Sequence, residues 1–341
     1  MVKNLVYPSL KNKTFLVTGA TGSFGTYFIK HLLKNYSAKK IIIYSRDELK
    51  QSELKDDLVQ EFKNIKNVRF FIGDVRDYPR LLVASKNVDI IVHAAALKQV
   101  PTIEYNPFEA IKTNILGAQN IIQAAIENNV KKIIALSTDK ASAPINLYGA
   151  TKLASDKLFI SANNIVGGKD IRFSVVRYGN VFGSRGSVVP FFIKHQSKDY
   201  FPITDKDMTR FHITLEQGIQ FVLMSLVKMY GGEIFIPKLK SIKIVDLAKA
   251  IDPNKKIKIV GIREGEKLHE DMVTESESIH TIIYKDYLVI ASESKLQKYN
   301  IKNIAKITNG KISNKRFSYT SNSENSFLTI DEIAREIKKI K

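Results

Sequence analysis

The sequence predicts an α/β fold: a doubly wound parallel sheet of the Rossmann type, followed by a smaller C-terminal lobe. Short apolar runs rich in β-branched residues alternate with helical stretches through the first half of the chain. Such alternation is typical of βαβ units, whose parallel strands are apolar throughout because helices cover both faces of the sheet. A cluster of glycines also stands directly between the first apolar run and the first helical stretch. After Gly179 the alternation breaks up, so we expect a first domain over residues 1–180 and a lobe over residues 181–341, partly interleaved with it.

The elements follow from these patterns in chain order. The expected strands of the sheet are residues 14–17, 40–44, 68–72, 90–93, 132–136 and 172–176, and the expected helices between them are residues 24–33, 47–62, 108–127 and 147–162. In the lobe we expect strands at 233–236, 256–260 and 287–290, and helices at 215–229 and 244–250. Thr329 and Glu332 have capping-box spacing and start a last amphipathic helix. The polar stretch 301–326 is expected to form a surface loop.

Composition and charge limit the classes of function. The 341 residues are 44% hydrophobic and 26% charged, contain no cysteine, and include no apolar run of membrane-spanning length. Residues 1–13 lack the apolar core of a signal peptide, so we expect a cytoplasmic protein without disulfides. The net charge of +19 comes from scattered lysines, and no nucleic-acid-binding module is present, so we expect neither a nucleic-acid nor a membrane partner. The six histidines show no paired helical spacing, and we expect no metal site.

The segment TGATGSFG, residues 18–25, follows the first expected strand and opens the first expected helix. Glycines at such a turn allow a close approach of the backbone to a pyrophosphate, and the helix N-terminus offers free N–H groups. The spacing GxxGxxG resembles the short-chain dehydrogenase form of a dinucleotide site. The residues predicted to bind the cofactor here are Gly19, Thr21, Gly22, Ser23, Phe24 and Gly25.

The end of the second expected strand indicates which dinucleotide binds. An NAD site places an acidic residue there for the ribose hydroxyls, but this chain has Ser45 and Arg46, with Asp47 and Glu48 only afterwards and then Lys50. A hydroxyl and a guanidinium suit the 2′-phosphate of NADP, which is the cofactor we predict. The alternative is that Asp47 holds the ribose and Arg46 is a solvated charge.

Two further strand ends complete the predicted cofactor site. Asp74 and Val75 follow the third expected strand and should lie beside the adenine. The small residues Ala94, Ala95 and Ala96 follow the fourth and leave room for the cofactor.

The fifth expected strand ends at a set of candidate catalytic residues. Tyr148 and Lys152 are four residues apart, which places them on one face of a helix. An ammonium beside a phenol favours the phenolate, so a group with a free pKa of about 10 can act as a base closer to neutrality. Asp139 and Lys140 stand at the strand end itself and would add an acid and a base for a second chemical step. The alternative for this second pair is a surface ion pair.

Nearly the whole chain carries dense motifs, in the order TGATGSFG, YSRDELKQSE, FIGDVRD, HAAALKQVP, LSTDKA, PINLYGATK, RYGNVFGSRGSVVPFF and GIREGEKLHE. Together they resemble the extended short-chain dehydrogenase/reductase family and, within it, the inverting UDP-N-acetylglucosamine 4,6-dehydratases that open pseudaminic acid biosynthesis. Capsule-type and retaining UDP-N-acetylhexosamine 4,6-dehydratases look similar but commonly carry Met where Tyr148 stands. The chain departs from the family pattern at Ala20, Ala143 and His212.

The resemblance implies further binding residues and an assembly. It adds Lys98 to the cofactor site and implies contacts to a UDP-sugar from Lys98, Asn180, Val181, Arg185, Arg210, Arg263, Glu266 and Tyr319. Paired arginines suit a diphosphate because their planar forks match its oxygens. The family also suggests a homo-oligomer, a hexamer. Whether the sugar has the gluco or the galacto configuration stays open.

The mechanism expected from these residues has three steps. Tyr148, helped by Lys152, takes the C4 hydroxyl proton while hydride passes from C4 to NADP⁺. Lys140 then removes the C5 proton, and Asp139 protonates the departing C6 hydroxyl. Hydride returns to C6, and C5 receives a proton on the opposite face. The alternative from another class is a protein that binds NADP as a sensor and performs no chemistry.

Overall fold

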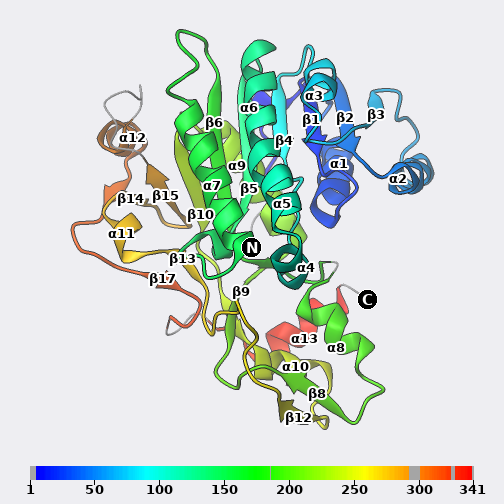
Figure 1. Cartoon of the computed structure of the whole chain (residues 1–341), viewed down its shortest axis with the longest axis vertical. Helices are drawn as coiled ribbons and strands as arrows, with labels where there is room; N and C mark the ends of the chain where they lie inside the picture. The colour runs from blue at the N-terminus through cyan, green and yellow to red at the C-terminus, as the bar shows by residue number, and fades with distance from the viewer. Residues whose placement is uncertain (1–4, 185, 292–299, 324–326, 340–341) are drawn as a thin grey trace.

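The computed structural model describes residues 5–184, 186–291, 300–323 and 327–339. Its main sheet has the strand order β16-β14-β15-β10-β6-β5-β4-β1-β2-β3 (Figure 1). The first six strands are β1 (Thr14–Thr18), β2 (Lys40–Ser45), β3 (Val68–Ile72), β4 (Ile90–His93), β5 (Lys132–Thr138) and β6 (Arg172–Tyr178). These strands are parallel, and their order is that of the doubly wound dinucleotide-binding fold. The predicted fold class and all six predicted strands are confirmed, with ends that differ by two residues at most.

The far edge of the main sheet is built from the second half of the chain. Strand β10 (Glu233–Pro237) runs parallel to β6, and β15 (Tyr287–Ala291), β14 (Thr281–Ile283) and β16 (Lys311–Ile312) extend the sheet in antiparallel fashion. Strands from beyond residue 180 therefore lie in the same sheet as the first six. The division into domains at residue 180 stays a prediction.

Helices cover both faces of the sheet. One side carries α6 (Gly117–Glu127) and α7 (Leu147–Ala162), and the other carries α1 (Ser23–Asn35) and α9 (Leu215–Lys228) (Figure 1). Beside them lie η1 (Pro8–Leu10), α2 (Glu48–Glu61), α3 (Tyr78–Ala84), α4 (Val100–Tyr105) and α5 (Pro107–Ala110). The single helix predicted over residues 108–127 is wrong in detail, because a π-helical segment, η2 (Ile111–Leu116), separates α5 from α6.

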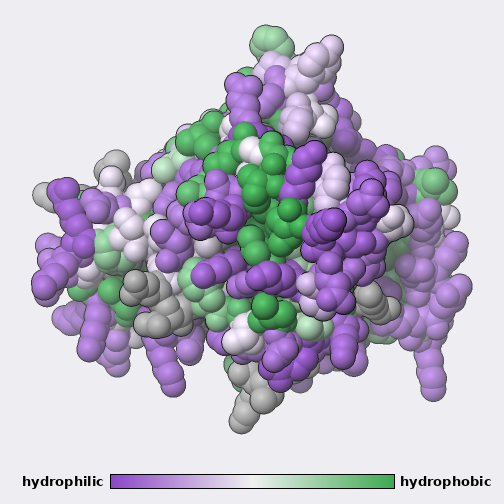
Figure 2. All heavy atoms as spheres, turned by 90° about the horizontal axis from the view of Figure 1, so that it is seen from below, coloured by the Kyte–Doolittle hydropathy of each residue, from purple (hydrophilic) through white to green (hydrophobic). Residues whose placement is uncertain are grey.

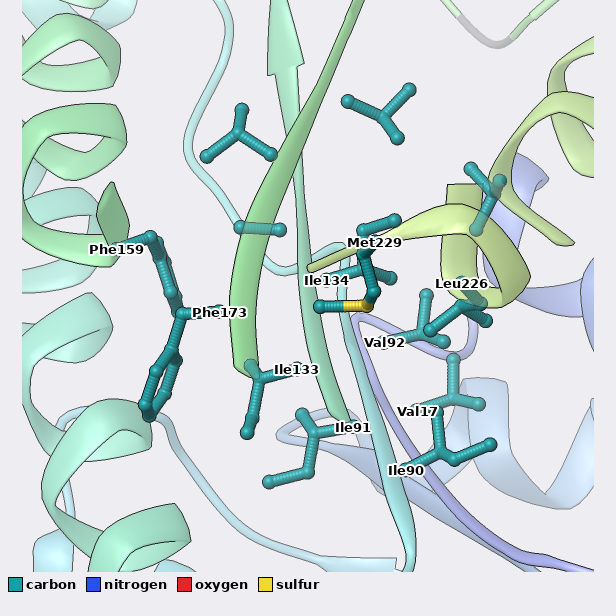
Figure 3. Packing of buried hydrophobic residues seen from close by; sticks show 14 of the residues in the cluster. Val17, Ile90, Ile91, Val92, Ile133, Ile134, Phe159, Phe173, Leu226 and Met229 are labelled. Carbon is teal, nitrogen blue, oxygen red and sulfur yellow. The ribbon is translucent and has the colours of Figure 1, made fainter. Parts of the chain in front are cut away.

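The core shows why the strands are apolar on both sides. Ile133 lies in register with Phe173, and both face Phe159 of α7 (Figure 3). The next residue, Ile134, points to the opposite face, toward Leu226 of α9 (Figure 3). All five side chains are fully buried. Because side chains alternate across a strand, a sheet covered twice needs an apolar residue at nearly every position.

The lower lobe has a core of its own. Its sheets are β7 (Asn180–Val181) with β9 (Thr209–Ile213) and β11 (Ser241–Lys243), and β8 (Tyr200–Ile203) with β12 (Lys256–Ile259). Helices α8 (Val188–Lys194), α10 (Ile244–Ile251) and α13 (Ile330–Lys338) pack around them. The capping box predicted at Thr329 and Glu332 is confirmed. Seen from the lobe side, hydrophilic side chains surround a stripe of apolar ones (Figure 2).

The loop predicted over residues 301–326 is wrong. This stretch contains α12 (Ile301–Thr308), the sheet strand β16, and β17 (Tyr319–Thr320), which pairs with β13 (Asp271–Val273). Ile301 and Ile304 are buried at helical spacing. Short elements remain at η3 (Asp139–Ala141) and α11 (Glu275–Ser278). Within the described parts of the chain, no helix is long and apolar enough to cross a bilayer.

Candidate active site

A cavity of about 610 Å³ lies along the carboxyl ends of the parallel strands. Its lining takes residues that end or follow β1, β2, β3, β4, β5 and β6 in turn, which is where ligands bind in doubly wound sheets. Its size is that of a small-molecule site. All predicted cofactor residues except Glu48 line the cavity, as do Lys140, Asn180 and Val181. Glu48 is exposed at the start of α2.

The glycine turn after β1 is shaped for a close backbone approach. Gly19 has φ of +63°, and a Cβ placed there would lie 2.8 Å from the backbone carbon of Ala94. A Cβ at Gly25 would lie 2.5 Å from the Cα of Ala20. Helix α1 begins at Ser23, so its free N–H groups face the same turn. These features fit the pyrophosphate of a dinucleotide.

The end of β2 places its charges at the solvent-exposed end of the cavity. Asp47 caps α2: its carboxylate accepts a hydrogen bond from the Lys50 N–H at 3.0 Å and pairs with Lys50 Nζ at 2.8 Å. The Arg46 side chain is 54% exposed and lies 3.6 Å from Asp74. The acidic residue that would compete for the ribose is therefore engaged by its own helix, while the guanidinium remains at the cavity.

Asp74 is held by the arginine two residues later. Arg76 donates to it at 2.7 Å and also contacts Glu109 at 2.6 Å. Burial alone would raise the pKa of Asp74, but the hydrogen bonds and charge of Arg76 hold it below its usual value. Asp74 is thus an acceptor at neutral pH.

A buried asparagine that the sequence reasoning missed fixes the loop after β4. Asn114 lies in the π-helical segment η2, where its side chain accepts from the Leu97 N–H at 2.9 Å and donates to the Leu97 carbonyl at 3.0 Å. It also donates to Thr151 of α7 at 3.0 Å. Because Leu97 lines the cavity, this asparagine holds one wall in place. A π-bulge is a common sign of a functional position.

Tyr148 and Lys152 start α7 and line the inner end of the cavity. Burial raises the pKa of Tyr148 to about 12, against the lowering effects of the Lys140 charge and a hydrogen bond with Thr138. Burial also lowers the pKa of Lys152. The expected depression of the phenol pKa is therefore not found, because loss of water outweighs the neighbouring charges.

Lys140 lies between two carboxylates. Its Nζ is 2.9 Å from Glu270 Oε1, 3.1 Å from Asp139 Oδ1 and 3.3 Å from Asn180 Oδ1. Burial would lower the pKa of Lys140, but the charges of Asp139 and Glu270 outweigh it and hold the pKa above its usual value. Asp139 is fully buried behind Thr138, whose hydroxyl donates to it at 2.9 Å and which itself lines the cavity.

A second buried group of charges supports the catalytic helix. Asp156 follows Lys152 by one helical turn, accepts from Ser137 at 2.7 Å, and lies 3.8 Å from Arg177. Arg177 is fully buried and pairs with Glu277 at 2.9 Å. The i+4 spacing from Lys152 was the signal in the sequence that could have found Asp156.

The predicted substrate residues are not all gathered at the cavity. Arg210 donates to the carbonyls of Thr209 and Leu268 and lies 3.5 Å from Glu266. Arg263 is exposed, and neither it nor Glu266 lines the cavity. The Tyr319 hydroxyl is engaged by the backbone of Leu239. Arg185 lies outside the described residues. These contacts stay predictions.

Within the described residues, no three His, Asp or Glu side chains gather in a way that could hold a metal ion. His93, in the middle of β4, bonds with the Thr18 hydroxyl at 2.8 Å, and burial lowers its pKa to about 3.

The comparisons place this site in a known family. The model of the family described as polysaccharide biosynthesis protein matches residues 15–292. The chain belongs to this polysaccharide biosynthesis family. A relative from Campylobacter jejuni (strain 81-176), named UDP-N-acetylglucosamine 4,6-dehydratase (inverting), is 59% identical over 83% of this chain and 84% of its own length. The resemblance predicted from the motifs is confirmed.

Other proteins similar to this chain carry different names. A relative from Rickettsia bellii (strain OSU 85-389), named UDP-glucose 4-epimerase, is 45% identical over 78% of this chain and 79% of its own length. Among solved structures, Pen from Bacillus thuringiensis is similar with a TM-score of 0.84 and 35% identity, covering 97% of this chain and 99% of its own. The relatives of this chain therefore carry both dehydratase and epimerase names, and the site residues must separate the two activities.

Proposed function

We propose that this chain is an NADP-dependent UDP-N-acetylglucosamine 4,6-dehydratase that inverts C5, a lyase acting at the first step of pseudaminic acid biosynthesis. The observation that carries the proposal is that Lys140 lines the same cavity as Tyr148 and Lys152. A hydroxyl oxidation at C4 needs only the tyrosine and its lysine, whereas water loss needs a further base near C5. The 59% identity to relatives with this name supports the substrate and the reaction. A cytoplasmic homo-oligomer belongs to the same proposal.

The cofactor assignment rests on two parts of the cavity, the glycine turn after β1 and the charged residues after β2. Gly19 and Gly25 leave room that a Cβ would fill, which fits a dinucleotide pyrophosphate. The carboxylate of Asp47 caps α2, and Arg46 stands exposed beside it, which supports NADP over NAD. A nicotinamide held in this cavity would supply the acceptor for the C4 hydride and the donor for the hydride at C6.

The chain's own residues then move the protons. Tyr148 takes the C4 hydroxyl proton, and the positive charge of Lys140 is the largest described influence that stabilises its phenolate. The resulting ketone acidifies the C5 proton, which Lys140 removes. Asp139 supplies a proton to the C6 hydroxyl as it leaves, with Thr138 between this carboxylate and the cavity. Tyr148, now a neutral phenol, returns its proton to C5 from the face opposite Lys140.

The test is to run the reaction on UDP-N-acetylglucosamine in D₂O and follow it by proton NMR. We expect a 4-keto-6-deoxy sugar with deuterium at C5 and the L-arabino configuration, observed before slow non-enzymatic epimerisation. The D-xylo configuration as first product would place the chain with the retaining enzymes. A C4 epimer without water loss would indicate an epimerase, and binding of NADP without turnover would indicate a sensor.

A further inference from the structure

Glu270 is a buried carboxylate behind the catalytic lysine that the proposed mechanism does not yet use. Glu270 is 1% exposed and does not line the cavity. Its backbone is held on both sides by Ser321, which accepts from the Glu270 N–H at 2.9 Å and donates its own N–H to the Glu270 carbonyl at 2.9 Å. Only its carboxylate reaches Lys140, at 2.9 Å. Glu270 is therefore placed to act through Lys140 rather than by touching substrate itself.

Lys140 must be neutral to act as a base, although its neighbours favour the charged form. A base needs a free electron pair, yet the charges of Asp139 and Glu270 favour the ammonium form of Lys140. Losing the proton to bulk water would leave two anionic carboxylates in a buried site, which like-charge repulsion and burial both disfavour. Passing the proton to one of these carboxylates keeps the net charge of the cluster, formed by Lys140, Asp139 and Glu270, constant. The proton that frees the lysine should therefore stay within the cluster.

The two carboxylates are not equivalent acceptors. Asp139 Oδ1 already accepts two hydrogen bonds, from the Thr138 hydroxyl at 2.9 Å and from Lys140 at 3.1 Å, so both lone pairs of this oxygen are engaged. Glu270 Oε1 accepts from Lys140 alone among the hydrogen bonds of the described residues, with Arg210 Nε farther away at 3.7 Å. Burial and then the charge of Asp139 raise the pKa of Glu270, against Lys140 and Arg210. Glu270 is the better acceptor.

The other groups that face this cluster also affect how readily Glu270 accepts a proton. Arg210 lies on β9 and faces both Glu270 and, at 3.5 Å, Glu266. Tyr148 on α7 faces Lys140 from the cavity side. The charge of Arg210 favours ionised Glu270, so an anionic diphosphate held by Arg210 would offset that charge and make Glu270 a stronger acceptor. Substrate binding would thus favour the active form of the lysine.

We propose that Glu270 takes the proton of Lys140 across their 2.9 Å contact and holds it through the elimination, so that the lysine is a neutral base. This inference rests on the proposed dehydratase function. The transfer turns the ammonium and the carboxylate into an amine and a carboxylic acid. The amine takes the C5 proton, passes it to Asp139, and Asp139 gives it to the C6 hydroxyl, which leaves as water. The C4 hydroxyl proton goes to C5 through Tyr148, and Glu270 keeps its proton until turnover ends.

The experiment compares wild type with Glu270→Gln, which keeps the shape of the side chain. In wild type the active form arises by an internal transfer, so C5–H exchange with D₂O should vary little around neutral pH. In Glu270→Gln the lysine must lose its proton to water while Asp139 still faces it. Exchange should fall on the order of 10²-fold at neutral pH and rise about tenfold per pH unit.

A second measurement separates this role from a structural one. C4 oxidation precedes the step that needs Glu270, so Glu270→Gln should accumulate reduced cofactor in a single turnover, seen by its absorbance. Glu270→Asp should restore part of the exchange, and Glu275→Gln, an exposed change on α11, should behave as wild type. A flat pH profile with normal exchange in Glu270→Gln would overturn the proposal and assign the proton to Asp139.

Loss of C4 oxidation together with exchange in Glu270→Gln would also overturn the proposal, because Glu270 would then only maintain the fold. A wild type that forms no 4-keto sugar would refute the proposed function itself, and the role of Glu270 would fall with it. The two failures are distinguished because the first requires an active wild type.

Discussion

Arg76 and Arg177 each pair with carboxylates at similar distances, yet they belong to very different environments. Arg76 lies 2.7 Å from Asp74 at the open end of the cavity, and its side chain is 35% exposed. Arg177 lies 2.9 Å from Glu277 beneath the catalytic end, and its side chain has no exposure. Coulomb attraction at equal distance is several times stronger where water is excluded. Distance alone therefore does not tell which contact the protein depends on.

The same difference divides the whole cavity. At the cofactor end, Arg46, Asp47 and Lys50 pair with neighbours within reach of water. At the catalytic end, Lys140 and Lys152 are largely buried, and their pKa values shift in opposite directions because only Lys140 has two carboxylates around it. Exposed charges suit recognition of a cofactor phosphate, whereas buried charges suit proton transfer. Substitutions should have larger effects toward the buried end.

The largest expected effect comes from removing the buried lysine. Lys140→Ala should abolish C5–H exchange and water loss, a drop on the order of 10²–10⁴-fold, while NADP still binds. NMR exchange in D₂O and calorimetry with NADP measure the two parts. The matched control is Lys55→Ala, an exposed lysine on α2 that does not line the cavity, which should leave exchange near normal. Near-normal turnover in Lys140→Ala would show that the base lies elsewhere.

The two arginines provide the next test, on stability. Arg177→Met leaves the buried carboxylate of Asp156 without its nearest cation and should lower the free energy of unfolding by about 3–5 kcal/mol. Arg76→Met removes an exposed pair and should cost about 0–1 kcal/mol. Denaturant unfolding of both variants measures the difference. Equal losses would mean that burial does not separate these contacts.

The sequence predicts the open end of the site better than the buried end. The glycine turn, Arg46 and Asp74 follow strands directly, so strand positions alone place them at the cavity. Glu270 comes to Lys140 from a loop 130 residues further along the chain, and no local pattern marks that contact. Asn114 was missed because apolar periodicity predicts a continuous helix and cannot reveal a π-helical insertion. Contacts made by tertiary packing are what the sequence leaves open.

The fold shows the same limit. The strands covered on both faces were predicted because they are apolar at nearly every position, as the pair Ile133 and Ile134 illustrates. The segment 301–326 was mistaken for a loop because its polar residues hide one apolar stripe. Only packing against the main sheet shows that Ile301 and Ile304 are buried there. Local composition is a weak guide where a helix has a narrow buried face.

The smallest expected effect on function lies at the exposed end, where Arg46 is proposed to hold the 2′-phosphate of NADP. Its side chain is 54% exposed and its contact with Asp74, at 3.6 Å, is loose, so the guanidinium can turn to a phosphate without breaking a buried pair. Arg46→Ala should weaken NADP⁺ binding by about 1.5–3 kcal/mol and leave NAD⁺ binding nearly unchanged.

Calorimetry with both cofactors on wild type and Arg46→Ala measures this difference directly. Because the contact is exposed, the preference for NADP⁺ should shrink as salt rises, since the Debye length falls to about 8 Å at physiological ionic strength. Arg46→Lys should recover only part of the affinity, because an ammonium cannot form the paired hydrogen bonds of a guanidinium. Equal affinities for NAD⁺ and NADP⁺ in wild type would instead indicate that Asp47 binds the ribose. Asp47 would then have to release the N-terminus of α2, which it caps.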